Sequence, residues 1–474
     1  MKNVNAKIGR SLMCYKTMRS AGHKHLGALY SSLLQRWIWA VVIVSLPSLA
    51  YAQISFSSAI DLALKNSPRV KMAEDDAKRA AESLSGIKNA FIPSITGSSG
   101  LGASSGITLN VPTIFTVSAQ SLVFNYSQPG NIRAGRLGVQ AADLSLRGIR
   151  EQVEEDAIVT YLSIDNAYQC QMALTSQYEF ALRLVSIVQE RFEAGYEDEL
   201  ELKKARRTAL QIKLQKSQME DLLVTLSEHL RELTGLENES QFIVPESVPR
   251  EELSSVTLLE SVPTCPDSPS ILSAEADAKA KLERATGESK YTWMPQVAFE
   301  AQYGRISPFN GVSSYYNLNG NYNTLSAGVQ FQFPFLDLGR KAKARESMAE
   351  AAHAEHQVAS LRSQQREDCV QLQHSSSQLA TRAELAELDQ EIATTQLKVA
   401  LLQQEQGVVT STSPPVTPKE GQNARIQERQ RYVDRIQATE QLYEAKVHLL
   451  RQSGKLDEWV NSLAGHIKAG QLNP

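Results

Sequence analysis

The stretch TLSAGVQFQFPFLDLGRKAKARESMAEAAHAEHQ, residues 324–357, joins two contrasting patterns. From Leu325 to Phe333, apolar and polar side chains alternate, which predicts a strand with one apolar and one polar face. Pro334 ends the alternation, and a run rich in Ala, Glu and Gln follows, with no further Pro before Pro414. A two-faced strand of about ten residues suits a membrane barrel, and a helix of roughly 65 residues would be about 100 Å long. The stretch therefore predicts a strand joined to a very long helix.

The first 52 residues have the features of a secretory signal peptide. They carry seven basic and no acidic residues, so without them the formal charge of −3 becomes −10, which disfavours a nucleic-acid partner. The apolar run Trp37–Leu49 ends in Ala-Tyr-Ala, which predicts cleavage between Ala52 and Gln53. A transmembrane anchor is the alternative, and Pro47 argues against it. Because no later run reaches about 18 apolar residues, we expect any membrane span of the exported protein to be formed by strands.

Three cysteines, Cys170, Cys265 and Cys369, follow the predicted signal peptide. An odd number leaves at least one thiol free. Cys170 and Cys369 fall inside predicted helices, which favours small buried side chains over a disulfide.

Two halves of the chain resemble each other. Ser67–Lys78 and Ser268–Lys279 are identical at seven of twelve positions. After each segment, a Pro precedes two strand patterns and a pair of long helical patterns. We therefore predict two tandem repeats, residues 53–262 and 263–474, each with a helix, two strands and a helical hairpin.

The bounds of the predicted elements follow from the same patterns. A single helix is expected over 57–92. The expected strands are 94–105, 113–124, 296–304 and 324–333, and the expected helical hairpins are about 130–235 and 338–460.

The predicted strands have one apolar face and aromatic ends. We expect Val297, Phe299, Val329 and Phe331 to face lipid. The ends nearest the helices carry Phe91, Phe124, Tyr126, Tyr291, Trp293, Phe333 and Phe335. Strands that run alternately up and down would place these residues at one level, as in the aromatic girdle at a membrane interface; simple packing at strand ends is the alternative.

The two predicted hairpins turn at Gly195 and Gly407, at corresponding places in the repeats. Glu197, Asp198 and Glu199 follow Gly195. These acids are equally consistent with the ordinary N-terminus of a helix and with a rim that docks a partner or attracts cations.

No catalytic, cofactor or metal site is predicted. His353 and His356 are spaced i, i+3 without a further ligand, which favours a solvated helix face over a metal site. No phosphate-binding loop and no set of nucleophile, base and acid is recognisable in the sequence, so we do not predict an enzyme.

The ordered motifs resemble the TolC-like outer-membrane efflux protein family over nearly all of the mature chain. The repeated Ser-Pro start is one such motif, and the helix–Pro–strand junctions at Pro93 and Pro295 are another. FPFLDLGR at Phe333–Arg340 and RFEAG at Arg191–Gly195 complete the set. The resemblance implies a mainly α fold with membrane β, in which antiparallel coiled-coil helices form a periplasmic tunnel. Each chain would give four strands to a twelve-stranded trimeric barrel.

The resemblance also implies a function. A homotrimer in the outer membrane, with a large periplasmic portion, would export small molecules such as drugs together with a periplasmic adaptor and an inner-membrane pump. Outer-membrane protein secretion of type I and a periplasmic coiled-coil adaptor without a pore are the alternatives. A four-stranded sheet with open edges in lipid also requires oligomeric closure, and three copies would supply about twelve strands.

The second hairpin turn departs from the family pattern. Gly407 leads into a segment that contains Pro414, Pro415 and Pro418, which no helix can cross. The family's acidic gate residues therefore have no counterpart here, and the nearest carboxylates are Glu405 and Glu420.

Overall fold

The computed structural model describes most of the chain in seven ranges. They are 52–99, 113–236, 241–255, 265–292, 294–306, 323–406 and 417–470. Two compact units are present, residues 1–53 and 54–474, and the account below concerns the second. The predicted signal peptide lies almost entirely outside the described residues. Ala52 and Gln53, which flank the predicted cleavage point, belong to β1 (Ala52–Ile54).

The first helical segment is broken into two helices. We expected one helix over 57–92, but α2 (Phe56–Asn66) ends before Ser67 and α3 (Pro68–Asn89) begins directly after it. Ser67 has φ −52° and ψ 127°, which is not helical. Pro68 explains the break, because a residue before Pro avoids the helical region while Pro itself is well suited to a first helical position.

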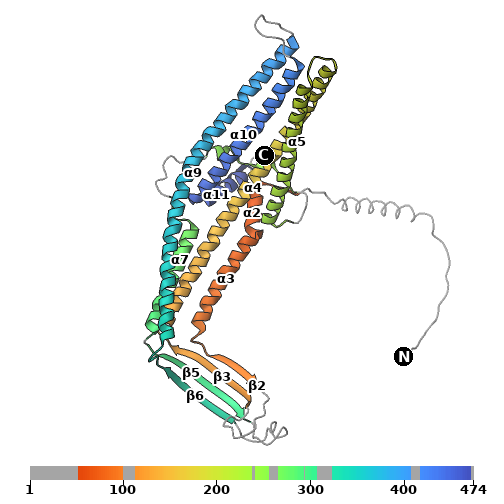
Figure 1. Ribbon diagram of the computed structural model, residues 1–474. Helices are drawn as coiled ribbons and strands as arrows, with labels where there is room; N and C mark the ends of the chain where they lie inside the picture. The colour runs from red at the N-terminus through yellow and green to blue at the C-terminus, as the bar shows by residue number, and fades with distance from the viewer. Residues whose placement is uncertain are drawn as a thin grey trace, which may run out of the picture. The chain divides into compact units, whose positions relative to one another are not determined.

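Two long helical hairpins dominate the structure (Figure 1). The first consists of α4 (Gln128–Glu193) and α5 (Glu199–Thr234), and the second of α9 (Leu338–Gln406) and α10 (Pro418–Gln452). The shorter helix α7 (Pro269–Tyr291) packs against both α4 and α9. Over the described ranges, we find no helix with the length and apolar character that crossing a membrane requires.

The second hairpin ends earlier than the expected 460. Gly454, with φ +68°, ends α10, and α11 (Leu456–Gly470) follows. The order helix, strand, strand, long helix, return helix nevertheless occurs twice, as α3-β2-β3-α4-α5 and as α7-β5-β6-α9-α10.

Four strands form one antiparallel sheet in the order β2-β3-β5-β6. Their bounds are Ser94–Ser99, Thr113–Phe124, Gln296–Ile306 and Asn323–Gln332. The second half of the strand expected at 94–105 lies outside the described residues. Figure 1 shows the sheet at one end of the long helices and the turn between α4 and α5 at the other end.

The main hydrophobic core lies midway along the helices, around Tyr161 of α4. The Tyr161 hydroxyl donates to Ile54 O at 2.8 Å, accepts from Val244 N at 3.0 Å and lies 2.9 Å from Ser247 Oγ. It thereby ties β1 to the segment that contains β4 (Gln241–Ile243) and the 3₁₀ turn η1 (Pro245–Ser247). The short helix α6 (Arg250–Ser255) follows and contributes Leu253 to the same core.

A disulfide joins Cys265 and Cys369, which corrects our expectation that Cys369 is unpaired. Cys265 lies just before α7 and Cys369 lies in α9, and because the two helices pack side by side the Cα atoms are 6.6 Å apart. Cys170 is free and buried, as expected. A link that closes a loop of 104 residues stabilises a fold by about 2–4 kcal/mol.

Candidate functional site

The sheet has one apolar and one polar face. In the register of β5 and β6, Val297 pairs with Phe331 and Phe299 pairs with Val329, so these four residues share one face. Gln330 opposes Ala298 on the other face. On β6 this face is exposed, since Val329 and Phe331 are 52% and 61% exposed, whereas Val297 and Phe299 of the inner strand β5 are half-buried. That this face contacts lipid stays a prediction.

Aromatic residues gather where the strands meet the helices. Six of the seven expected girdle residues lie in or beside these junctions: Phe91, Phe124, Tyr126, Tyr291, Phe333 and Phe335. Trp293 lies outside the described residues. The Arg340 guanidinium stacks on the Tyr291 ring at 4.2 Å, and the Tyr291 hydroxyl donates to Gln296 Oε1 at 2.6 Å. These contacts hold the start of α9 against the end of α7.

The two faces of β6 should respond differently to a charge. We expect Val329→Arg to destabilise the membrane-inserted protein by roughly 2–4 kcal/mol, whereas Gln330→Arg on the polar face is tolerated. Urea unfolding in lipid vesicles measures the difference. Equal losses for these neighbouring variants would contradict the assignment of the faces.

The first hairpin turn is built around Gly195, whose φ is +76°. Tyr196 N donates to Arg191 O at 2.8 Å and Gly195 N donates to Phe192 O at 3.0 Å, which satisfies the last carbonyls of α4. A Cβ added at Gly195 would meet no atom within 4 Å, so its backbone conformation alone requires glycine. The corresponding Gly407 lies outside the described residues.

The three acids after Gly195 have three different partners. Asp198 caps α5, since its Oδ1 accepts from Glu201 N at 2.9 Å. Glu199 pairs with Lys203 one turn along α5, at 2.8 Å. Glu197 is only 14% exposed and contacts Arg191 at 3.3 Å. Two of the acids therefore form an ordinary helix N-terminus, and the third does not.

Lys419 joins the two hairpins at their turn ends. Its Nζ lies 3.2 Å from Glu197 Oε1 and 2.8 Å from Glu201 Oε2. Hydrogen bonds to Glu201 and Glu197 raise the pKa of Lys419, while Lys204 and then Lys419 lower the pKa of Glu201 to about 2. The carboxylates at this turn are thus balanced by basic side chains, including one from the second hairpin.

Lys419 was not predicted from the sequence, although a local signal was present. Thr417 and Glu420 form a capping box at the start of α10, in which Glu420 Oε2 accepts from Thr417 N at 2.7 Å. The capping motif and Pro418 fix the first turn of α10 and so place Lys419 there. Glu420, one of the two carboxylates nearest the second hairpin turn, serves this cap.

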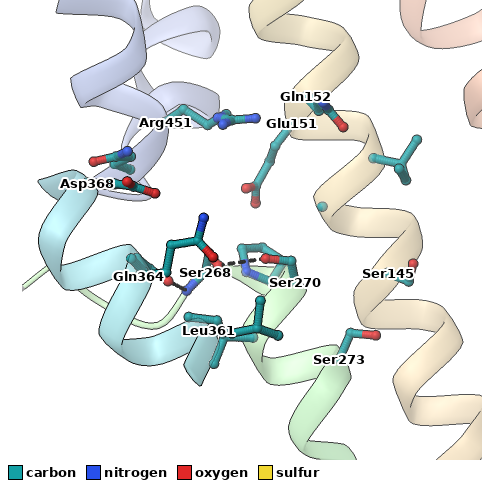
Figure 2. Close-up of a pocket in the computed structure, with 16 residues that line it drawn as sticks. Ser145, Glu151, Gln152, Ser268, Ser270, Ser273, Leu361, Gln364, Asp368 and Arg451 are labelled. Atoms are coloured by element: carbon teal, nitrogen blue, oxygen red, sulfur yellow. Dashed lines mark hydrogen bonds between the residues drawn. The ribbon is translucent and has the colours of Figure 1, made fainter. Parts of the chain in front are cut away.

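A pocket of about 460 Å³ lies between α4, α7, α9 and α10 (Figure 2). Three of its serines are hydrogen-bonded: Ser268 Oγ and Ser270 Oγ are 2.9 Å apart, and Ser273 Oγ donates to Ala141 O at 2.7 Å. Arg451 is engaged by Glu155 at 2.8 Å. Among the residues that line the pocket we find no pairing of nucleophile and base, and the pocket follows from the packing of four helices.

Charged side chains are also buried where α4, α10 and α11 meet. Burial and a hydrogen bond with Asp457 raise the pKa of Glu154 to about 8. His448 contacts Glu155, and hydrogen bonds to Glu155 and Glu444 raise its pKa to about 9. This cluster makes the stability of the helices sensitive to pH.

Residues 59–236 match the family model described as outer membrane efflux protein. The matched region is 178 of the 474 residues, so the match shows similarity to that family over this part of the chain. The resemblance expected from the sequence motifs is thereby confirmed, together with an outer-membrane location. No match was found among curated proteins.

Solved structures of outer-membrane proteins share the fold at low sequence identity. The chain is similar to the CmeC outer membrane channel of Campylobacter jejuni, with 18% identity and a TM-score of 0.66 over 88% of this chain and 89% of that chain. VceC of Vibrio cholerae is 15% identical, with a TM-score of 0.60 over 85% of this chain and 96% of that chain. The open state of the MtrE outer membrane channel of Neisseria gonorrhoeae is 13% identical, with a TM-score of 0.57 over 87% of this chain and 94% of that chain. These likenesses confirm the predicted fold class.

Proposed function

We propose that this efflux-family protein forms a trimeric channel that exports small molecules across the outer membrane, together with a periplasmic adaptor and an inner-membrane pump. The observation that carries the proposal is an exposed apolar seam on α9. Positions of the seam recur every three or four residues along α9, and the polar Thr395 occupies one of them. The apolar members are Leu385, Leu388, Ile392, Val399 and Leu402. Such a heptad seam is the contact surface of a coiled coil.

The partner for this seam is missing from the described part of the chain. Ile392 is 54% exposed, although α9 packs against α7 and α10 on its other faces. A second exposed seam runs along α5, with Leu200, Leu210, Leu214 and Val224 at heptad positions. An α9 seam of one copy against an α5 seam of the next would bury both, and such head-to-tail contacts close into a ring.

The sheet supports the same assembly. Strands β2 and β6 are its edges, with a free edge on each side among the described strands. Free edges cannot persist in lipid, so pairing of β6 from one copy with β2 from the next would satisfy both. We propose that Val297, Phe299, Val329 and Phe331 then face lipid.

We place the periplasmic end of the channel at the hairpin turns. The turn at Gly195 with Glu197, Asp198 and Glu199, and the turn at Gly407, would form the entrance and the contact for the adaptor. The position of the first turn, at the end of the helices away from the sheet, supports this assignment (Figure 1).

The seam on α9 is tested by a charge. We expect Ile392→Lys to abolish trimers, because three lysines would lie unpaired in a buried coiled-coil contact. Mass measurement in detergent and channel conductance in planar bilayers report the result. Glu387→Lys, on the same helix but away from the seam, is the control and should leave both unchanged. Intact trimers in the Ile392 variant would remove this seam from the assembly.

A further inference from the structure

We infer that the sheet-side ends of the helices bind the headgroups of anionic phospholipids in the adjacent membrane leaflet. The inference rests on the proposed placement of the sheet in the membrane. It is carried by an apolar belt at the strand–helix junctions and by a basic belt on the helix turns next to it.

The apolar belt lies outside the sheet itself. Its most exposed side chains come from the two junctions at Phe91 and Pro334: Phe91, Ile92, Phe333, Phe335, Leu336 and Leu338. Phe335 is 93% exposed. Exposed apolar and aromatic residues just beyond a lipid-facing sheet lie at the depth of the membrane–water interface. At that depth a side chain contacts acyl chains on one side and headgroups on the other.

The basic belt begins on the helical side of these residues. The last ten residues of α3 and α7 and the first ten of α4 and α9 together carry nine basic and four acidic side chains. The chain without its first 52 residues has a formal charge of −10. Positive charge is therefore concentrated at the helix ends that meet the sheet, in an otherwise acidic protein.

The start of α9 carries an excess of positive charge, although Arg340 also pairs with Asp337 and Lys343 pairs with Glu346. Four basic residues lie in its first eight positions, and no acidic residue lies in its first turn. A helix N-terminus carries a partial positive charge and favours acids, so these residues are placed where the helix dipole opposes them. An anionic partner outside the protein would compensate for this repulsion.

Each of the four helices supplies one basic side chain that is free to meet such a partner. Lys88 of α3, Arg136 of α4, Lys290 of α7 and Arg345 of α9 are exposed and form no ion pair with any described residue. Lys88 and Lys290 lie one residue from a helix end. Arg136 and Arg345 lie within roughly 12 Å of the sheet-side end of their helices. A long side chain and a Debye length of about 8 Å together let their charge reach a headgroup at that end.

Brominated lipids test the inference directly. The full trimer is placed in vesicles of phosphatidylcholine mixed with brominated phosphatidylglycerol or with brominated phosphatidylcholine, and quenching of tryptophan fluorescence reports the lipid at the protein surface. Trp293 lies in a junction segment by its sequence position, and Trp459 packs against the core and serves as a constant background. We expect wild type to favour phosphatidylglycerol about five-fold, the effect of one Lys or Arg near an anionic surface.

The decisive variant combines Lys88→Gln, Arg136→Gln, Lys290→Gln and Arg345→Gln, and its preference should fall to about one-fold. The control removes the same charge from exposed lysines that lie far along the helices from the sheet-side ends: Lys65, Lys71, Lys213 and Lys398, each to Gln. The control should keep the preference. A preference that survives in the fourfold junction variant would overturn the inference.

Wild type alone provides a second test that needs no substitution. Raising NaCl from about 0.05 to 0.5 M should abolish its preference, because screening shortens the reach of the belt. A wild-type protein that floats with vesicles but shows no preference at low salt refutes the lipid inference and leaves the channel proposal intact. A wild-type protein that enters neither kind of vesicle refutes the membrane placement itself.

Discussion

Cells that carry Glu197→Lys, Asp198→Lys and Glu199→Lys together are expected to lose efflux as completely as cells without the protein, while trimers remain in the outer membrane. The contacts at the turn give the reason. Glu197 lies between Arg191 and Lys419, so a lysine there would place three positive charges together and separate the two hairpins. The Asp198 change removes the cap of α5, which costs about 1 kcal/mol and leaves the rest of the helix intact.

Single substitutions should divide this effect unequally. Glu197→Lys alone is expected to cause most of the loss. Glu199→Lys is the matched comparison and should lose much less, because the ion pair that Glu199 forms within the described residues is with Lys203 of its own helix. Drug susceptibility and trimer abundance are measured in the same strains. Full resistance in the triple variant would remove the acidic turn from the mechanism, and trimer loss in proportion to lost resistance would show a role in folding only.

Alkaline conditions are expected to destabilise the helical part of the protein. Glu154 has a pKa of about 8 in the folded state against an ordinary value of 4.5, so the folded state holds an extra proton between these values and loses that advantage as pH rises through 8. His448, with a pKa of about 9, contributes stability that is complete below about pH 6.5 and lost as pH rises through 9. Both effects have the same sign.

The pKa shift of Glu154 corresponds to a loss of at most about 5 kcal/mol in the free energy of unfolding. Solvent screening reduces the expected loss between pH 5 and pH 9 to roughly 2–3 kcal/mol. Thermal unfolding of the detergent-solubilised protein at a series of pH values measures the loss. Glu154→Gln, which is neutral at every pH, should remove the contribution of Glu154 and leave that of His448. Glu82→Gln, on an exposed face of α3, should leave it unchanged. A melting temperature that rises from pH 5 to pH 9 would contradict the prediction.

Elements with a local signal could be predicted from the sequence. The alternation from Leu325 to Phe333 and the stop at Pro334 define β6 to within a residue, because side-chain period and proline chemistry act over neighbouring positions. The turn at Gly195 was found for the same reason. Where a local signal was misread, as at Pro68, the error was also local, and a broken helix was taken for a continuous one.

Contacts between distant segments could not be predicted in this way. Cys265 and Cys369 are 104 residues apart, and only the packing of α7 on α9 brings them within bonding distance. Lys419 and Glu197 are likewise joined across 222 residues. Residue spacing along a chain fixes the distance between side chains only within one element, so the ion pair that joins the hairpins had to be seen in three dimensions.

The disulfide divides the longest helix into two parts with different freedom. Up to Cys369, α9 is fixed by the disulfide and by Arg362–Asp267 at 2.9 Å to the segment just before α7, and by Arg362–Glu275 at 2.6 Å to α7 itself. From Val370 to Gln406 it is held by noncovalent packing alone. A helix that is fixed at one point can move freely only beyond that point. If the channel opens at the hairpin turns, α9 would then pivot about Cys369. The part of the channel nearest the membrane would keep a constant width throughout transport.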